Sequence, residues 1–114
     1  TLQMIELYTY KARCVSVYDG DSITLDIDLG FNHWMLNQKI RLFGINTPEI
    51  RGSERLSGLI ARDRLRELIE GKDIILASHM DRAGKYGRWL GTIYLDEINI
   101  NKLLLEEGLA SIYE

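Results

Sequence analysis

The chain has 114 residues, of which 46% are hydrophobic and 27% are charged. This length suits one domain with a real core, residues 1–114, and the composition excludes collagen-like and disordered proteins. Apolar runs reach only three or four residues, far short of the roughly 20 that span a bilayer, so we expect no membrane association. No signal peptide is visible, and the single cysteine, Cys14, excludes an internal disulfide.

Charge is unevenly distributed around a formal net value of −3. Residues 39–88 contain eleven Lys and Arg against seven Asp and Glu, whereas the flanking segments contain three against ten. The middle of the chain can therefore face a polyanion while its ends keep the protein soluble. A solvated helix surface gives similar counts, so both interpretations stay open.

The first half of the chain predicts three strands, at residues 11–18, 22–29 and 34–45. The second strand alternates cleanly and directs one set of apolar side chains inward, namely Ile23, Leu25, Ile27 and Leu29. In the third strand, Leu42, Phe43 and Ile45 are expected to lie in the core. Pro48 then ends this strand, because proline cannot donate to a sheet and restricts the residue before it.

The second half predicts a helix, two strands and a shorter helix. The first helix, residues 53–70, is expected to start at a Ser53 cap and to end at Gly71, with a buried stripe of Leu56, Ile60, Leu65, Leu68 and Ile69. Strands at 73–78 and 89–95 precede a helix at 100–107, which Asn99 caps. This order fits an α+β protein with an OB-fold, a five-stranded antiparallel β-barrel with a helix between strands three and four and a C-terminal helix.

Three short segments at strand ends combine charge with turn residues. Asp19-Gly20-Asp21-Ser22 places two carboxylates beside a glycine, which suits either a hard cation or a plain hairpin turn. The segment from Arg41 to Glu49 contains a guanidinium that can bind phosphate by two hydrogen bonds and a carboxylate that can accept a proton from water. The alternative is a surface ion pair between the two side chains that contributes little to stability. Lys85-Tyr86-Gly87-Arg88 adds a second fork and a ring for stacking, or a solvated basic turn.

Together with Asn101 to Ala110, these segments resemble the staphylococcal-nuclease-like (thermonuclease) domain. The four motifs of that family read DGD[TS], R-L-x-G-[IV]-D-T-P-E, K-Y-G-R and N-x-x-L-[VL]-x-x-G-L-A, and all four occur here in the family's order across roughly residues 11 to 112. The resemblance implies an OB-fold nuclease that cuts DNA or RNA with calcium and leaves a 3′-phosphate.

The resemblance also implies a role for each matching residue. Arg41 and Arg88 would hold the scissile phosphate, and Glu49 would orient or deprotonate the attacking water. The residues expected to bind one calcium ion are Asp21, Asn46 and the carbonyl of Thr47, with Asp19 behind them acting through water. Lys85 and Tyr86 would contact the substrate, and Tyr86 would line the nucleotide pocket.

The chain departs from the family pattern at Asn46, where the usual residue is a carboxylate. We expect weaker calcium binding there, because ligand charge tunes affinity in such sites. The chain is expected to be a monomer, and by resemblance a secreted or cell-surface location is conceivable. The sequence leaves two functions open, a nuclease with little sequence preference and a non-catalytic OB-fold module that binds nucleic acid or protein. The intact set of Arg41, Glu49 and Arg88 favours the enzyme.

Overall fold

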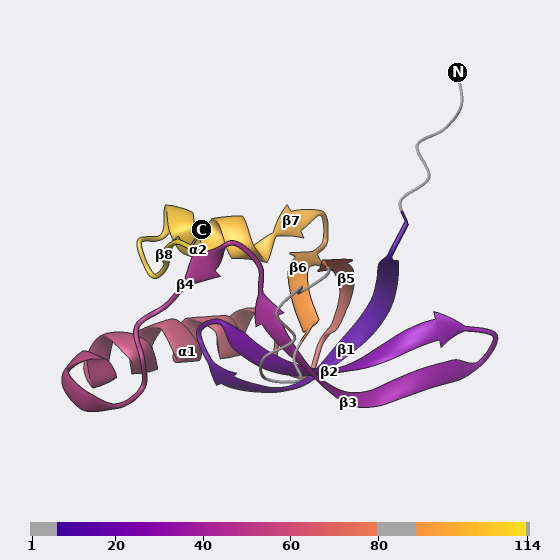
Figure 1. Ribbon diagram of the computed structural model, residues 1–114, viewed down its shortest axis with the longest axis horizontal. Helices are drawn as coiled ribbons and strands as arrows, with labels where there is room; N and C mark the ends of the chain where they lie inside the picture. Colours follow the sequence, from indigo (N-terminus) through magenta and orange to yellow (C-terminus); the bar gives the residue numbers. More distant parts are fainter. Residues whose placement is uncertain (1–6, 80–88, 114) are drawn as a thin grey trace, which may run out of the picture.

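The computed structural model describes residues 7–79 and 89–113. Its elements, shown in Figure 1, are β1 (Thr9–Asp19), β2 (Ser22–Gly30), β3 (His33–Leu42), β4 (Ile45–Asn46), the 3₁₀ turn η1 (Gly52–Glu54), α1 (Arg55–Ile69), β5 (Asp73–His79), β6 (Trp89–Leu95), β7 (Ile98–Asn99), α2 (Ile100–Glu106) and β8 (Ser111–Ile112). Among the described residues, no helix has the length and apolar character needed to cross a lipid bilayer.

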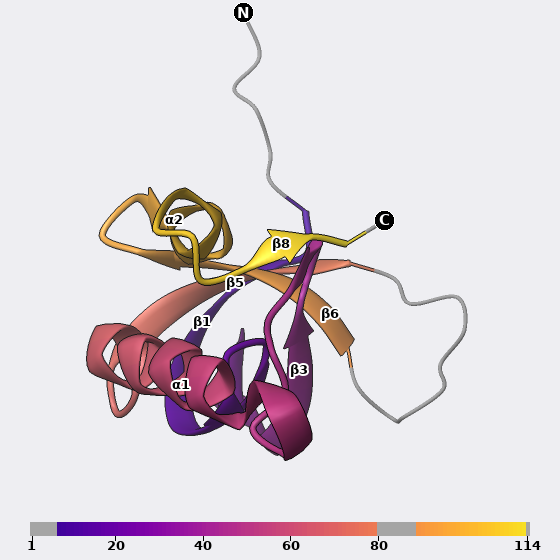
Figure 2. The same ribbon diagram turned by 90° about the vertical axis from the view of Figure 1, so that its left-hand side faces the viewer.

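Five strands close into a barrel in the order β3-β2-β1-β5-β6. Neighbouring strands pair antiparallel, but the closing pair is parallel and joins Ile40–Leu42 of β3 to Trp89–Gly91 of β6. The OB-fold prediction is confirmed, whereas the expectation of a wholly antiparallel barrel was wrong. Helix α1 packs against β1, and α2 packs against β6 (Figure 2).

The barrel interior is filled by mainly aliphatic side chains from the five barrel strands, from β4 and from both helices. In β2, the predicted alternation holds for Ile23, Leu25 and Ile27, which are at most 5% exposed. Leu29 is 42% exposed, contrary to expectation, because the β2–β3 hairpin extends beyond the barrel (Figure 1). Cys14 is fully buried, and burial raises the pKa of its thiol to about 12.

Helix α1 differs from the predicted helix in its start and in its buried face. No Ser53 cap forms: Ser53 lies in η1, and the residue before the helix, Glu54, makes no capping side-chain bond. The buried residues are Gly58, Ala61, Leu65 and Ile69. Leu56 and Ile60, predicted to be buried, are 78% and 59% exposed, because the 3.6-residue period places them on the opposite side of the helix.

The third predicted strand is interrupted at its C-terminal end. β3 ends at Leu42, Gly44 has a φ of 79°, and β4 then pairs with β8. This break turns Phe43 outward. Phe43 is 45% exposed, so the prediction that it lies in the core was wrong. The buried amide of Asn101 secures the break by donating to the carbonyls of Phe43 and Gly91 and by accepting from the Ile93 N–H.

Helix α2 begins as predicted. The Asn99 side chain accepts a hydrogen bond from the Lys102 N–H at 3.0 Å, which satisfies one of the free donors of the first turn.

Candidate functional site

A groove of about 790 Å³ lies between α1 and the outer face of β1, β2 and β3. Five of the residues predicted to carry the chemistry line it directly, namely Asp19, Asp21, Arg41, Asn46 and Glu49. They come from the β1–β2 turn, the end of β3, β4 and the following loop. The barrel therefore brings together side chains that the sequence separates by up to 30 positions.

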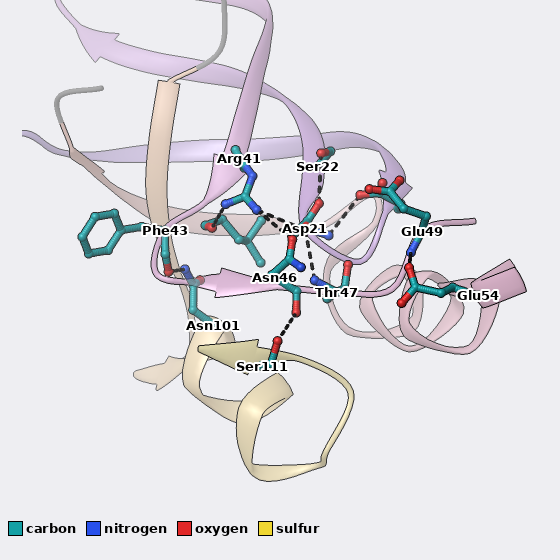
Figure 3. A network of polar contacts seen from close by, with 12 residues as sticks. Asp21, Ser22, Arg41, Phe43, Asn46, Thr47, Glu49, Glu54, Asn101 and Ser111 are labelled. Atoms are coloured by element: carbon teal, nitrogen blue, oxygen red, sulfur yellow. Dashed lines mark hydrogen bonds and ion pairs between the residues drawn. The ribbon is translucent and has the colours of Figure 1, made fainter. Parts of the chain in front are cut away.

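The carboxylate of Asp21 is the centre of a polar network that includes Ser22, Arg41 and Thr47 (Figure 3). One carboxylate oxygen accepts the Ser22 hydroxyl at 3.2 Å. The other accepts the Thr47 N–H at 3.1 Å and lies 3.5 Å from Arg41 Nη2. Asp21 is only 7% exposed, so these contacts offset much of the cost of burying its charge.

The Arg41 guanidinium is fixed from several sides. Nη2 donates to Asn46 Oδ1 at 3.1 Å, and Nη1 lies 3.5 Å from the Leu42 carbonyl. The ring of Tyr113 packs over the guanidinium, with its centre 4.6 Å from Cζ. Only 15% of the Arg41 side chain is exposed, so its fork is oriented before any ligand arrives, which lowers the entropic cost of binding a phosphate.

Asp19 lies behind Asp21 and is 6% exposed. Its carboxylate accepts the Asp21 N–H at 3.1 Å, which shapes the turn between β1 and β2. Burial, followed by the nearby carboxylates of Asp21 and Glu49, raises the pKa of Asp19 to about 6. The site therefore holds closely spaced acids that a cation would stabilise.

Glu49 is exposed, and its position depends on a close contact with α1. Its N–H lies 3.4 Å from a carboxylate oxygen of Glu54. A Cβ atom at Gly58 would come within 2.2 Å of the Glu49 carbonyl oxygen and 2.9 Å of the Ile50 nitrogen. Only glycine at position 58 lets the helix approach this loop so closely. In Figure 3, Glu49 lies beyond Thr47, and Phe43 points away from the network.

The residues expected to bind calcium are all oxygen donors, which suits a hard divalent cation in kind. The described residues contain no group of three or more His, Cys, Asp or Glu side chains close enough to hold a metal ion. A cation here would therefore rely on the Asn46 amide and the Thr47 carbonyl beside the carboxylates. The buried Thr47 hydroxyl, which lacks a hydrogen-bond partner among the described residues, adds one more oxygen next to this set.

Some predicted residues fall outside the structure, and some structural contributors were not predicted. Lys85, Tyr86 and Arg88 lie outside the described residues. Gly58 and Tyr113 were not predicted to matter. An isolated glycine inside a helical pattern is a recognisable signal of close packing, whereas nothing in the sequence indicates that Tyr113 contacts Arg41. Gly20, which belongs to the predicted turn motif, is packed as closely, because a Cβ atom there would lie 2.7 Å from Thr47 Oγ1.

The chain is similar to several proteins that are longer than itself. It is 38% identical to the staphylococcal-like nuclease CAN1 of Arabidopsis thaliana over 76 residues, which cover 66% of this chain and 22% of that protein. It is 29% identical to an uncharacterized protein of Methanocaldococcus jannaschii, with coverage of 91% and 59%, and 27% identical to one of Bacillus anthracis, with coverage of 93% and 49%. The chain thus spans about half the length of the latter two relatives.

A family comparison gives the broader assignment. Residues 39–114 match the family described as staphylococcal nuclease homologue. This match includes the end of β3, β4, α1 and α2, and it contains Arg41, Asn46, Thr47 and Glu49. Because it covers well over half of the chain, the protein belongs to the staphylococcal nuclease homologue family.

Proposed function

We propose that this protein is a calcium-dependent nuclease that hydrolyses phosphodiester bonds of DNA or RNA with little sequence specificity, and that it acts as a monomer. The observation that carries the proposal is the placement of Arg41, Asp21 and Glu49 in one groove, with Arg41 held rigidly by its neighbours. All of these residues come from a single chain. Similarity to the staphylococcal-like nuclease CAN1 of Arabidopsis supports the same activity.

In this proposal Arg41 binds the scissile phosphate through its fork, and Arg88 adds a second guanidinium. Charge that accumulates on the phosphate oxygens in the transition state strengthens both contacts, which lowers the barrier. Glu49 orients a water molecule and takes its proton, since its carboxylate is exposed within the groove. Contacts to phosphate carry no sequence information, which accounts for the low specificity.

Calcium would be held by Asp21, Asn46 and the Thr47 carbonyl, with Asp19 acting through water. When bound, it supplies positive charge that polarises the phosphate. Asn46 contributes no negative charge, and Arg41 already lies against the Asn46 and Asp21 oxygens. We therefore propose that calcium binds more weakly than it would with a carboxylate at position 46. Lys85 and Tyr86 are proposed to contact the nucleotide.

The test is cleavage of fluorescent single-stranded DNA by the purified protein with calcium and with EDTA. We expect cleavage only with calcium, and loss of cleavage in both Glu49→Ser and Arg88→Gly. The matched controls are Glu97→Ser, an exposed glutamate outside the groove, and Arg13→Gly on the outer side of β1. Cleavage that persists in EDTA, or in the Glu49 and Arg88 variants, would contradict the proposal.

A non-catalytic OB-fold module that binds nucleic acid or protein is the second candidate. The observation that favours it is the contact between Arg41 Nη2 and Asn46 Oδ1 at 3.1 Å, because a guanidinium there competes with a metal ion for the same oxygen. Binding of DNA without cleavage, across divalent metals and pH, would support this module and refute the nuclease.

A further inference from the structure

The groove continues beyond the candidate phosphate site, along the barrel and away from Asp21. In the β2–β3 pairing, Ser22 is opposite Arg41, and Thr24 is opposite Lys39; Thr24 is in turn opposite Ser16 of β1. Alternate residues of a strand share a face, so Lys39 and Arg41 point to the same side of β3. Hydroxyl side chains therefore form the floor of the groove beside two basic residues.

One wall of the groove is β3, which carries Lys39 and Arg41. The other wall is the side of α1 that carries Arg62 and Arg66, which line the same groove. Arg66 is already engaged, because Nη2 donates to the Val17 carbonyl at 3.1 Å. Among the described residues, the polar partner of the Arg62 guanidinium is the adjacent Asp63, at 3.0 Å, and that carboxylate is 63% exposed. Within residues 7–79 and 89–113, the side chain of the exposed Lys39 has no hydrogen bond or ion pair. Lys39 on β3 and Arg62 on α1 thus line one groove together with these hydroxyl groups.

We propose that Lys39 and Arg62 form a second phosphate subsite, which binds the backbone of an extended single strand of DNA or RNA next to the phosphate held by Arg41. The proposal rests on the proposed function in taking a nucleic acid as the ligand. Lys39 lies two residues from Arg41, or about 7 Å along the strand, which is close to the spacing of neighbouring phosphates in an extended chain. Ser16 and Thr24 supply hydroxyl donors between the two walls.

The dimensions of the groove favour a single strand over a duplex. On the sheet side the groove spans three neighbouring strands, from β1 through β2 to β3, which together are about 10 Å wide. The major groove of B-DNA alone is about 12 Å wide, so a complete duplex is too broad to lie between β3 and α1. A single strand exposes its phosphates to both walls at once, and Lys39 and Arg62 then contact the backbone without reading the bases.

The experiment measures binding of labelled oligothymidylate by fluorescence anisotropy in EDTA, over a series of salt concentrations. We expect Lys39→Gln and Arg62→Gln each to weaken binding by about 3- to 10-fold and to reduce the slope of log affinity against log salt by about 0.7, the value for one phosphate contact on a single strand. Lys102→Gln on α2 and Arg13→Gln on β1 are matched controls outside the groove and should leave both quantities unchanged. Circular dichroism of each variant establishes that it is folded.

Cleavage assays on the same variants separate this inference from the proposed function. With oligothymidylate we expect a raised KM and an unchanged kcat, and with dithymidylate, which is too short to reach the second subsite, we expect no effect. If the wild type cleaves but the Lys39 and Arg62 variants have the same salt slopes as the controls, only the subsite is overturned. The predicted slopes without any cleavage would support the subsite and overturn the nuclease. Tighter binding of a duplex than of a single strand would also overturn the inference.

Discussion

At position 46, the amide is both a candidate calcium ligand and a hydrogen-bond partner of the Arg41 guanidinium. Its oxygen accepts from Arg41 at 3.1 Å but brings no charge to a cation. We predict that Asn46→Asp tightens calcium binding by about 10-fold, because each added carboxylate raises the affinity of an oxygen site. Isothermal titration with calcium measures this directly.

Asn32→Asp is the control for that experiment, since it makes the same charge change in the turn of the β2–β3 hairpin. Asn32 has a φ of 61°, a conformation that aspartate tolerates. A general electrostatic effect would tighten calcium binding in both variants, whereas a ligand role confines the effect to position 46. Unchanged affinity in Asn46→Asp would show that this residue does not hold the ion.

Ionisation of Asp19 is expected to lower the stability of the folded protein at neutral pH. Because its pKa in the folded protein is raised from 3.8 to about 6, the folded state binds the proton more tightly than the unfolded state. The free energy of unfolding therefore falls as pH rises from about 4 to above 6. Asp19→Asn keeps an oxygen for the Asp21 N–H, and we predict that it raises the free energy of unfolding at pH 7 by about 1 to 3 kcal/mol.

Urea unfolding in EDTA at pH 4 and pH 7 tests this prediction. The two proteins should be nearly equal in stability at pH 4, where Asp19 is protonated in the folded chain and about half protonated in the unfolded chain, and they should differ at pH 7. A loss of stability of the same size at both pH values would mean that Asp19 stabilises the turn through a contact that asparagine cannot replace. The same variant should bind calcium less tightly.

At the scale of elements, α1 positions the Glu49 loop through Gly58. Gly→Ala in an exposed helix interior usually stabilises by about 1 kcal/mol. Here the added Cβ would lie 2.2 Å from the Glu49 carbonyl oxygen, so the loop and its carboxylate must move. We predict that Gly58→Ala lowers both the melting temperature and kcat, the latter by about 10-fold or more, since small displacements of a catalytic group are costly.

Ser57→Ala is the matched control, because it places alanine at the neighbouring exposed position of α1 and meets no loop. It should melt at or slightly above the temperature of the wild type and cleave normally. Stabilisation by Gly58→Ala, of the size seen at exposed helix positions, would show that the loop shifts without cost and that the close contact does not position Glu49.

The same helix illustrates what sequence patterns can and cannot predict. The presence of α1 and its end at Gly71 follow from local signals, and Gly71 has the left-handed φ of 76° that such an end requires. Its exposed Leu56 and Ile60 were predicted to be buried, because two apolar stripes with similar spacing occur on one helix. Only the position of β1 determines which stripe is covered.

At the scale of the whole molecule, the strands were predictable and their closure was not. Alternation along β2 identifies a half-buried strand from a few residues, but the parallel pairing of Ile40 with Trp89 joins segments 49 positions apart and leaves no local trace. The same division applies to the site. Motif resemblance identified Asp21, Arg41 and Asn46, which the fold brings into contact, whereas the packing of Tyr113 on Arg41 depends on where the chain returns after α2.

That return makes the last residues of the chain a support for the site. β8 pairs with β4, matching Asn46 with Ser111 and Ile45 with Ile112, and the Tyr113 N–H donates to the Gly44 carbonyl at 2.9 Å. Ile112 and Tyr113 are 72% and 56% exposed, so these residues bury little apolar surface and contribute little to global stability.

Ending the chain after Ala110 should therefore separate function from folding. We predict a melting temperature within about 8 °C of the wild type, together with weaker calcium binding and at least about 10-fold slower cleavage, because Arg41 and Asn46 lose their support. Tyr113→Phe retains the ring over the guanidinium and should cleave at the wild-type rate. Tyr113→Leu should cleave about 3- to 10-fold more slowly, the range expected for loss of a cation–π contact. If the shortened chain cleaves at the wild-type rate, β3 and β4 alone hold Arg41 and Asn46 in place, and the contact with Tyr113 is incidental to catalysis.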